Sequence, residues 1–327
     1  MAFARTGVKS MRHALLLLLL ISAGGPAVGQ TEPLRVFASV FPLRTFVEKV
    51  GGKHVDVRAM VRPGYSPHIY NPTPQQISAL AEAVLYVRVG VPFEDAWIER
   101  IRSVNPDMRI LDVRSGMELR GLEAHGHDDG GNGNAHGASR QKQGHDRNAE
   151  GHEQEADHSV DAHHHESDPH VWTSPTLVKQ MVGLIRAELA ELDPAHAADF
   201  ARNQDTYVAE LDALDRELRT LLEPLHNRKF MVFHPAWGYF AATYGLVQVP
   251  IEREGKESGA RTLAMLIDQA KREKVRVVFV QPQLDKRQAR QIARAIGGSV
   301  ITVDPLAPNY IDNLYQVARQ FAEALQP

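Results

Sequence analysis

Hydrophobic and polar residues follow two alternating patterns along most of this chain. Short apolar runs rich in β-branched residues predict strands, and apolar residues at three- and four-residue steps predict helices. The strands predicted in the first half lie at 34–41, 55–61, 83–90 and 109–113. The segments with helical spacing between them are 42–50, 74–82 and 93–103. This alternation indicates βα units that form a mainly parallel sheet.

The second half of the chain repeats the pattern. Its predicted strands lie at 229–233, 246–250, 275–280 and 299–303. Its predicted helices lie at 260–273, 285–296 and 309–325. We therefore expect an α/β protein with two lobes, an N-terminal lobe over 30–192 and a C-terminal lobe over 226–327.

The segment 193–225, between the two lobes, predicts one long helix. Its apolar residues recur at helical steps: Phe200, Tyr207, Leu211, Leu214, Leu218 and Leu221. Asp193 is expected as the N-cap and Pro194 as the first-turn proline. About 30 helical residues would reach about 45 Å, which is longer than one lobe needs. A rigid link between the lobes is therefore favoured over a helical hairpin packed within one lobe.

The tract 123–166 has no hydrophobic pattern and is rich in Gly, Asp, Glu, Asn, Gln and His. It holds nine of the 16 histidines: His125, His127, His136, His145, His152, His158, His163, His164 and His165. Such a segment cannot form a core, so we expect a disordered insertion in the N-terminal lobe. Weak capture of metal ions is favoured over a solvated loop without a role, because imidazoles and carboxylates are metal ligands.

The first 29 residues predict a signal peptide. Basic residues precede a short apolar run at 14–21, and Ala27-Val28-Gly29 offers small residues for cleavage near Gln30. The apolar run is far too short to span a membrane, which needs about 20 residues. The chain has no cysteine, so it lacks the residue that bacterial lipoproteins carry at their cleavage site. We expect a periplasmic protein that is not a lipoprotein.

The net charge and the absence of cysteine limit the possible partners and the possible metal ligands. A formal net charge of -3 argues against a nucleic-acid partner. The absence of cysteine excludes disulfides and thiolate metal sites. Any metal site must therefore use nitrogen and oxygen donors.

Three histidines outside the tract share a local context. His68 lies in "RPGYSPHIYNPTP", His170 in "SDPHVW" and His234 in "VFHPAWGY", each with a neighbouring proline that restricts its loop. His68 and His234 follow predicted strands, and ligands of open α/β sheets gather beyond the carboxyl ends of strands. Asp304 also follows a predicted strand, at 299–303.

Three imidazoles with one carboxylate suit Zn²⁺, which prefers tetrahedral nitrogen and oxygen donors. The other histidines outside the tract are interpreted as structural, or as part of the signal peptide in one case: His54, His196, His226 and His13.

Several longer segments add a family resemblance: "GYSPHIYNPTPQQISALAEAVLYVRVG", "DPHVWTSP", "FHPAWGYFAATYGL" and "VVFVQPQLDKRQARQIARAIGGSVITVDPL". Together with the long helix they resemble the cluster A-I solute-binding proteins of ABC importers, of the ZnuA/TroA type. The resemblance covers nearly the whole chain after residue 30. It implies two α/β lobes joined by one long rigid helix, with a metal ion between the lobes.

The resemblance assigns metal ligation to His68, His170, His234 and Asp304. Manganese-type members usually carry a glutamate at the third position, so His234 favours zinc, as does the histidine-rich loop. Some zinc members have an acidic ligand directly before the first histidine, where this chain has Pro67. The fourth ligand is therefore expected to be Asp304 or a water, and Asp168 is expected to cap a helix or orient His170.

The function implied is capture of periplasmic Zn²⁺ by a monomer for delivery to an inner-membrane ABC permease with a cytoplasmic ATPase. Import of manganese or another divalent metal is one alternative, and a stand-alone zinc buffer or chaperone is another. An enzyme is not expected, because the sequence has no HExxH motif, nucleophile elbow or phosphate-binding loop.

Overall fold

The computed structural model describes residues 32–121, 167–252 and 259–326. The predicted signal peptide at 1–29 and the histidine-rich tract at 123–166 lie outside these described residues. Within the described ranges, no helix has both the length and the apolar character that a membrane span requires.

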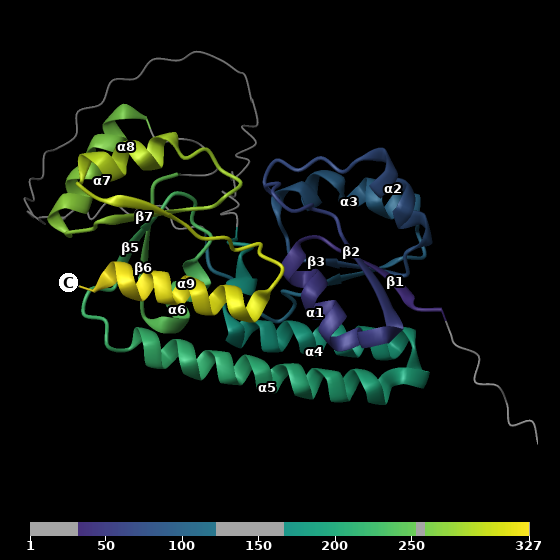
Figure 1. Cartoon of the computed structure of the whole chain (residues 1–327). Helices are drawn as coiled ribbons and strands as arrows, with labels where there is room; N and C mark the ends of the chain where they lie inside the picture. Colours follow the sequence, from purple (N-terminus) through teal and green to yellow (C-terminus); the bar gives the residue numbers. More distant parts are fainter. Residues whose placement is uncertain (1–31, 122–166, 253–258, 327) are drawn as a thin grey trace, which may run out of the picture. The chain divides into compact units, whose positions relative to one another are not determined.

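The first half of the chain forms a four-stranded parallel sheet in the order β2-β1-β3-β4 (Figure 1). Its strands are β1 (Leu34–Ala38), β2 (Val55–Ala59), β3 (Leu85–Arg88) and β4 (Arg109–Asp112). The intervening helices are α1 (Phe41–Gly51), η1 (Gly52–His54), α2 (Pro74–Ala79), η2 (Leu80–Glu82) and α3 (Pro92–Val104). Helices α2 and α3 lie on one side of the sheet and α1 on the other.

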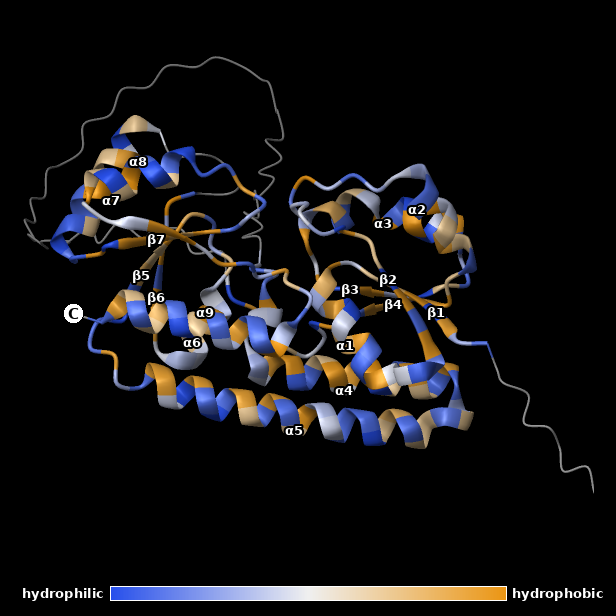
Figure 2. Cartoon of the chain, in the orientation of Figure 1, coloured by the Kyte–Doolittle hydropathy of each residue, from blue (hydrophilic) through white to orange (hydrophobic). Residues whose placement is uncertain are grey.

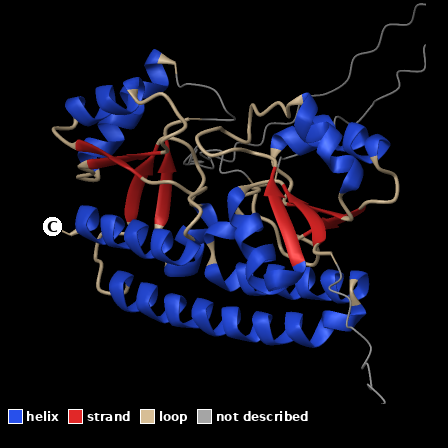
Figure 3. Cartoon of the chain, turned by 45° about the vertical axis from the view of Figure 1, so that its right-hand side comes forward, coloured by secondary structure: helices blue, strands red, loops and turns tan. Residues whose placement is uncertain are grey.

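The second half repeats this arrangement in a sheet of order β6-β5-β7-β8, again parallel throughout. Figure 3 shows the two sheets as separate groups of strands. Its strands are β5 (Lys229–Val232), β6 (Val247–Pro250), β7 (Val277–Val280) and β8 (Ser299–Thr302). Its helices are α6 (Gly238–Tyr244), α7 (Ala260–Arg272), α8 (Arg287–Ala295) and α9 (Tyr310–Leu325). Each predicted strand is present in shortened form, and the predicted α/β class with two parallel sheets is confirmed.

Two long helices connect the halves. After η3 (Val171–Thr173) come α4 (Pro175–Leu192), the one-turn η4 (Pro194–His196) and α5 (Ala197–Leu222). The long predicted helix is present as α5, but the expectation that Asp193 and Pro194 begin it is wrong. Pro194 instead begins the one-turn η4, which Asp193 precedes, and the Asp193 side chain pairs with His196 instead of capping a backbone N–H.

Helix α5 packs against elements of both halves. Figure 2 shows hydrophobic positions recurring along this helix. Its buried face consists of Phe200, Tyr207, Leu211, Leu214, Leu218 and Leu222. This face contacts α1 and α4 from the first half and α6 and α9 from the second. One continuous core cluster therefore includes residues of both sheets and of α5. A smaller cluster fills the space between the second sheet and helices α7 and α8.

We predict that Leu211→Ala lowers the free energy of unfolding by about 2–5 kcal/mol, because its side chain is fully buried in the shared core. Glu217→Ala, on the exposed face of the same helix, should change it by less than about 0.5 kcal/mol. Urea denaturation followed by circular dichroism measures both. A loss for Leu211→Ala no larger than that for Glu217→Ala would contradict the view that α5 anchors the shared core.

Candidate metal centre

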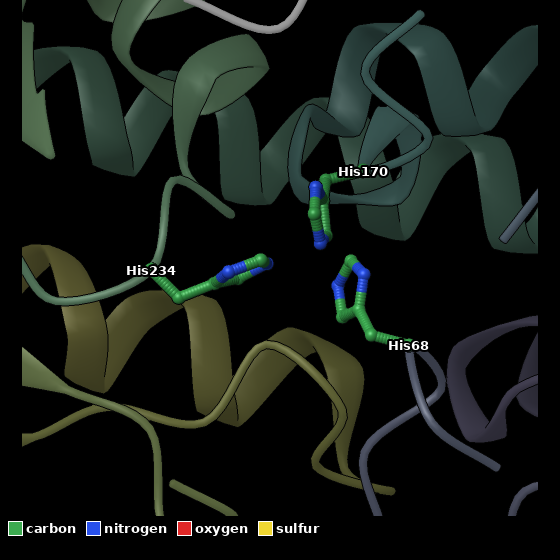
Figure 4. Close-up of side chains that lie close together, drawn as sticks. All are labelled: His68, His170 and His234. Atoms are coloured by element: carbon green, nitrogen blue, oxygen red, sulfur yellow. The ribbon is translucent and has the colours of Figure 1, made fainter. Parts of the chain in front are cut away.

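Three histidines from separate loops converge on one point (Figure 4). Each of His68, His170 and His234 offers a ring nitrogen, and the three nitrogens lie within 4.8 Å of one another. The ring centroids are 4.4 Å apart for His68 and His234, and 5.2 Å apart for His170 and His234. Around a tetrahedral Zn²⁺ with bonds of about 2.0–2.1 Å, ligand nitrogens are about 3.3 Å apart. Small side-chain rotations would bring the three nitrogens to that spacing.

His68 lies in the loop between β2 and α2, and hydrogen bonds fix that loop. The Gln76 side chain donates to the carbonyl oxygen of Met60 at 2.6 Å and accepts from the Tyr70 hydroxyl at 2.8 Å. Thr73 and Gln76 also form a capping box at the start of α2. These contacts hold both ends of the loop that carries His68.

His170 is oriented by Asp168, as the sequence predicts. The Asp168 Oδ1 atom lies 2.7 Å from His170 Nδ1 and accepts the His170 backbone N–H at 2.9 Å. A carboxylate only accepts hydrogen bonds, so Nδ1 is the protonated nitrogen and the lone pair of Nε2 is left for a metal. The Tyr239 hydroxyl donates to the Asp168 carbonyl at 3.0 Å, which attaches this segment to the second half of the chain.

His234 follows β5 by two residues and is also paired with a carboxylate. Its Nδ1 lies 3.4 Å from Glu252 Oε2, and both side chains are buried. Glu252 was not predicted from the sequence. The signal was present, because Glu252 follows β6 by the same two residues by which His234 follows β5. Since β5 and β6 are neighbours in the sheet, equal offsets place the two side chains together.

Asp304 does not join the three histidines in this structure. Among the described residues, the group whose ligand atoms lie within 4.8 Å contains His68, His170 and His234 but not Asp304. Asp304 follows β8, and β7 separates β8 from β5, so β8 lies about 10 Å from the strand that carries His234. Its Oδ1 atom accepts hydrogen bonds from Gln283 Nε2 and the backbone N–H of Leu306, both at 2.9 Å.

Asp304 nevertheless faces the loop before His68, since it lines a small cavity together with Arg62 and Tyr65. Its role as a ligand remains a prediction.

Burial keeps the imidazoles of His68 and His234 uncharged. Desolvation, followed by the proximity of His234 and His170, lowers the pKa of His68 from its usual 6.5 to about 2. Desolvation also lowers the pKa of His234, against the opposing effect of the Glu252 carboxylate. The Nε2 atoms of His68 and His234 are buried without a hydrogen-bond partner in the described structure. Neutral imidazoles with unshared lone pairs are the form that binds a metal ion.

The donor set favours a borderline transition metal. Three imidazole nitrogens suit Zn²⁺ better than Mn²⁺, which prefers oxygen ligands. The carboxylates of Asp168 and Glu252 behind two of the rings complete the arrangement typical of zinc-binding histidines. The site can therefore hold Zn²⁺ with three protein nitrogens and leave a coordination position for a further oxygen ligand.

Comparison with known proteins agrees with this chemistry. The model of the family described as "Zinc-uptake complex component A periplasmic" matches residues 36–324. The chain is 28% identical over 289 residues to the high-affinity zinc uptake system protein ZnuA of Bacillus subtilis (strain 168), covering 87% of this chain and 82% of that protein. It is 25% identical over 275 residues to the zinc-binding protein AdcA of Streptococcus pyogenes serotype M1, covering 84% of this chain and 50% of that protein.

Solved structures of similar proteins also include zinc-uptake components. A crystal structure of ZnuA is 36% identical, with a TM-score of 0.76, and the match covers 90% of this chain and 100% of that one. The structure of a zinc-bound ZnuA variant lacking residues 138–173 matches with the same values.

The two parallel sheets and the histidine centre define a TroA-like solute-binding protein of the zinc type. The chain belongs to the family of the periplasmic zinc-uptake component A, which confirms the predicted resemblance.

We predict that the metal-free protein loses stability as the pH falls below about 6.5. The unfolded state takes up a proton on His68 near that pH, whereas folded His68 stays neutral down to about pH 2. The free energy of unfolding should therefore be highest above about pH 6.5 and fall steadily toward acid pH. His68→Gln should reduce this loss between about pH 7.5 and pH 5.

Urea denaturation of the metal-free protein at both pH values measures the effect. His226→Gln is the matched control, because His226 is exposed. The same pH dependence in His68→Gln and in the control would contradict the assignment.

Proposed function

We propose that this protein captures Zn²⁺ in the periplasm and delivers it to an ABC permease for uptake into the cell. The observation that carries the proposal is the convergence of three histidines on one point, with His170 and His234 buried and His68 partly buried. Two of them, His68 and His234, have unshared Nε2 lone pairs. Membership of the zinc-uptake family supports the same metal and the same role. The protein is a transport component and not an enzyme.

His68, His170 and His234 are the proposed ligands, with Asp304 or a water in the fourth position. The free coordination position of such a site would also suit a zinc hydrolase, which needs a base beside the metal-bound water. Here the two carboxylates nearest the rings, Asp168 and Glu252, each pair with a ring nitrogen. They therefore orient the ligands instead of serving as a base beside a metal-bound water, which favours metal binding over catalysis.

The finer parts of the proposal come from the sequence. Residues 1–29 act as a cleaved signal peptide, and the mature protein is a periplasmic monomer without a lipid anchor. Its partner is an inner-membrane permease with a cytoplasmic ATPase, and it has no nucleic-acid partner. A stand-alone zinc buffer would use the same site. Deleting a neighbouring permease gene distinguishes the two roles: poor growth when zinc is scarce supports delivery to the permease, and unchanged growth supports the buffer.

We predict that His68→Ala, His170→Ala and His234→Ala each weaken the tight Zn²⁺ site by at least about a hundredfold, because each removes a direct ligand. Asp168→Asn should weaken it by about 10–100-fold, because it only orients His170. Asp304→Ala should cost less than the histidine changes if a water replaces it. Titration against a fluorescent zinc chelator measures these affinities.

Two histidines serve as matched controls. His226→Ala, at an exposed position, and His145→Ala, within the tract, should leave the tight site unchanged. Deleting 123–166 should remove weakly bound ions and keep one tightly bound ion. Equal losses of affinity at the control and ligand positions would refute the ligand assignment.

The contacts between the two halves indicate small movements on binding. The Trp172 indole donates to the carbonyl oxygen of Pro305 at 2.8 Å, and the Tyr310 hydroxyl donates to the carbonyl oxygen of Trp172 at 2.9 Å. All these groups lie beside the segment that carries His170, and α5 packs against both halves. Wide opening would break these buried bonds, and a ligand shifts a conformational equilibrium only by its differential affinity for the two states.

We therefore predict that Zn²⁺ changes the loops around the three histidines while the lobes move little. Small-angle X-ray scattering of the metal-free and zinc-loaded protein lacking 123–166 should give nearly equal radii of gyration. Trp172 fluorescence should still respond, because its ring centroid lies 5.2 Å from that of His170. A large decrease in the radius of gyration on loading would show domain closure instead.

A further inference from the structure

A second group of metal-binding side chains lies at the other end of the first sheet. His54, Asp193 and His196 each offer a ligand atom, and these atoms lie within 4.8 Å of one another. His54 directly precedes β2, whereas His68 of the first centre lies in the loop that follows β2. The two groups are therefore at opposite ends of the same strand, so they are separate sites.

The two imidazoles of this group lie face to face. Their ring centroids are 3.8 Å apart, with an angle of 26° between the planes. Each ring also has one nitrogen on a carboxylate: His196 Nδ1 lies 2.5 Å from Asp193 Oδ2, and His54 Nε2 lies 2.8 Å from Asp199 Oδ2. For His54, the Asp199 carboxylate on Nε2 fixes the tautomer and directs Nδ1 to a metal, which is the usual arrangement around metal-binding histidines.

The surroundings of the group suit a cation. The side chains of Asp193 and Asp199 bring two negative charges, and Arg202 is ion-paired with Asp199. The side chains are shielded but still reachable, with 12% of His54, 24% of His196 and 15% of Asp193 exposed. An ion from solution can reach these donors without unfolding the protein.

We propose that His54, His196 and Asp193 form a second site for a divalent transition metal such as Zn²⁺, with Asp199 orienting His54. Two imidazoles and a carboxylate are suitable Zn²⁺ ligands, and water completes the coordination. The site is weaker than the first, because it is more exposed and its stacked rings must tilt apart to point at one ion. A metal here ties η1 of the first lobe to the η4 turn, where α5 begins. It therefore stiffens the junction between the lobe and the connecting helix.

The test uses the full-length protein with the first site removed by His68→Ala, His170→Ala and His234→Ala. Zn²⁺ is added, and hydrogen exchange is followed by mass spectrometry in peptides that cover 52–56 and 193–200. We expect Zn²⁺ to slow exchange in both peptides. Adding His54→Gln and His196→Gln should abolish that effect, while His226→Gln should leave it intact. Asp199→Asn should raise the Zn²⁺ concentration needed for half of the effect by about tenfold or more.

The glutamines keep an amide donor for each carboxylate, and circular dichroism checks that the variants fold. If the double variant does not fold, Asp193→Asn takes its place and should also weaken the effect. A zinc-dependent anomalous-scattering peak between His54 and His196 in crystals of the full-length protein would locate the ion directly. No zinc effect on the two peptides, or an effect unchanged by the glutamine substitutions, would overturn the proposal and leave the stacked pair with a packing role only.

Discussion

The metal centre depends on burying imidazole nitrogens that the protein does not satisfy. The Nε2 atoms of His68 and His234 are buried without a hydrogen-bond partner in the described structure. A buried polar atom without a partner costs about 1–3 kcal/mol, so the rest of the fold must offset this cost. Burial also explains the low pKa values of both rings, because a protonated imidazole is even less stable there than a neutral one. Metal binding gives these lone pairs a partner and so removes the cost. The desolvation of the metal-free site therefore contributes to the affinity for the metal.

The offsetting stability comes from the core that the two halves share. Helix α5 packs against α1 and α4 on one side of the centre and against α6 and α9 on the other. Buried hydrogen bonds from Tyr239 and Trp172 then attach the loop of His170 to the second half. The ligands are therefore held by contacts that do not involve the metal, so the site is largely formed before binding. A pre-formed site needs little conformational change to capture an ion. Release of the ion must then come from changes in the ligand loops.

Most of the fold could be predicted from the sequence, because strand and helix periodicities are local properties. The histidines of the centre could also be found, since prolines and strand ends mark their loops. The order of the strands could not be read from the sequence, and it decides which residues meet. Glu252 was missed because it follows β6 while its partner His234 follows β5, and these strands become neighbours only in the sheet. Strand order also leaves Asp304, after β8, apart from the three histidines in this structure, and its role as a ligand stays a prediction.

The contact between His54 and His196 could likewise not be predicted from the sequence, because the two residues are even farther apart along the chain than His234 and Glu252. Each residue alone has the features of a structural histidine at a turn, and 141 residues separate them in the sequence. They meet because η4 turns the chain between α4 and α5 back against η1, whereas the sequence predicts the start of one long helix there.

Charge balance connects the three histidines to the choice of metal. Three neutral imidazoles bring no negative charge to a divalent ion, yet an uncompensated charge is costly in a buried site. Asp168 and Glu252 supply two formal negative charges, each through the ring nitrogen that faces away from the metal. A bound ion would thus be balanced by carboxylates that pair with the rings, while three of the atoms that contact it would be nitrogens. Hard ions such as Mn²⁺ gain most from direct oxygen ligands, so placing the carboxylates behind the imidazoles favours Zn²⁺.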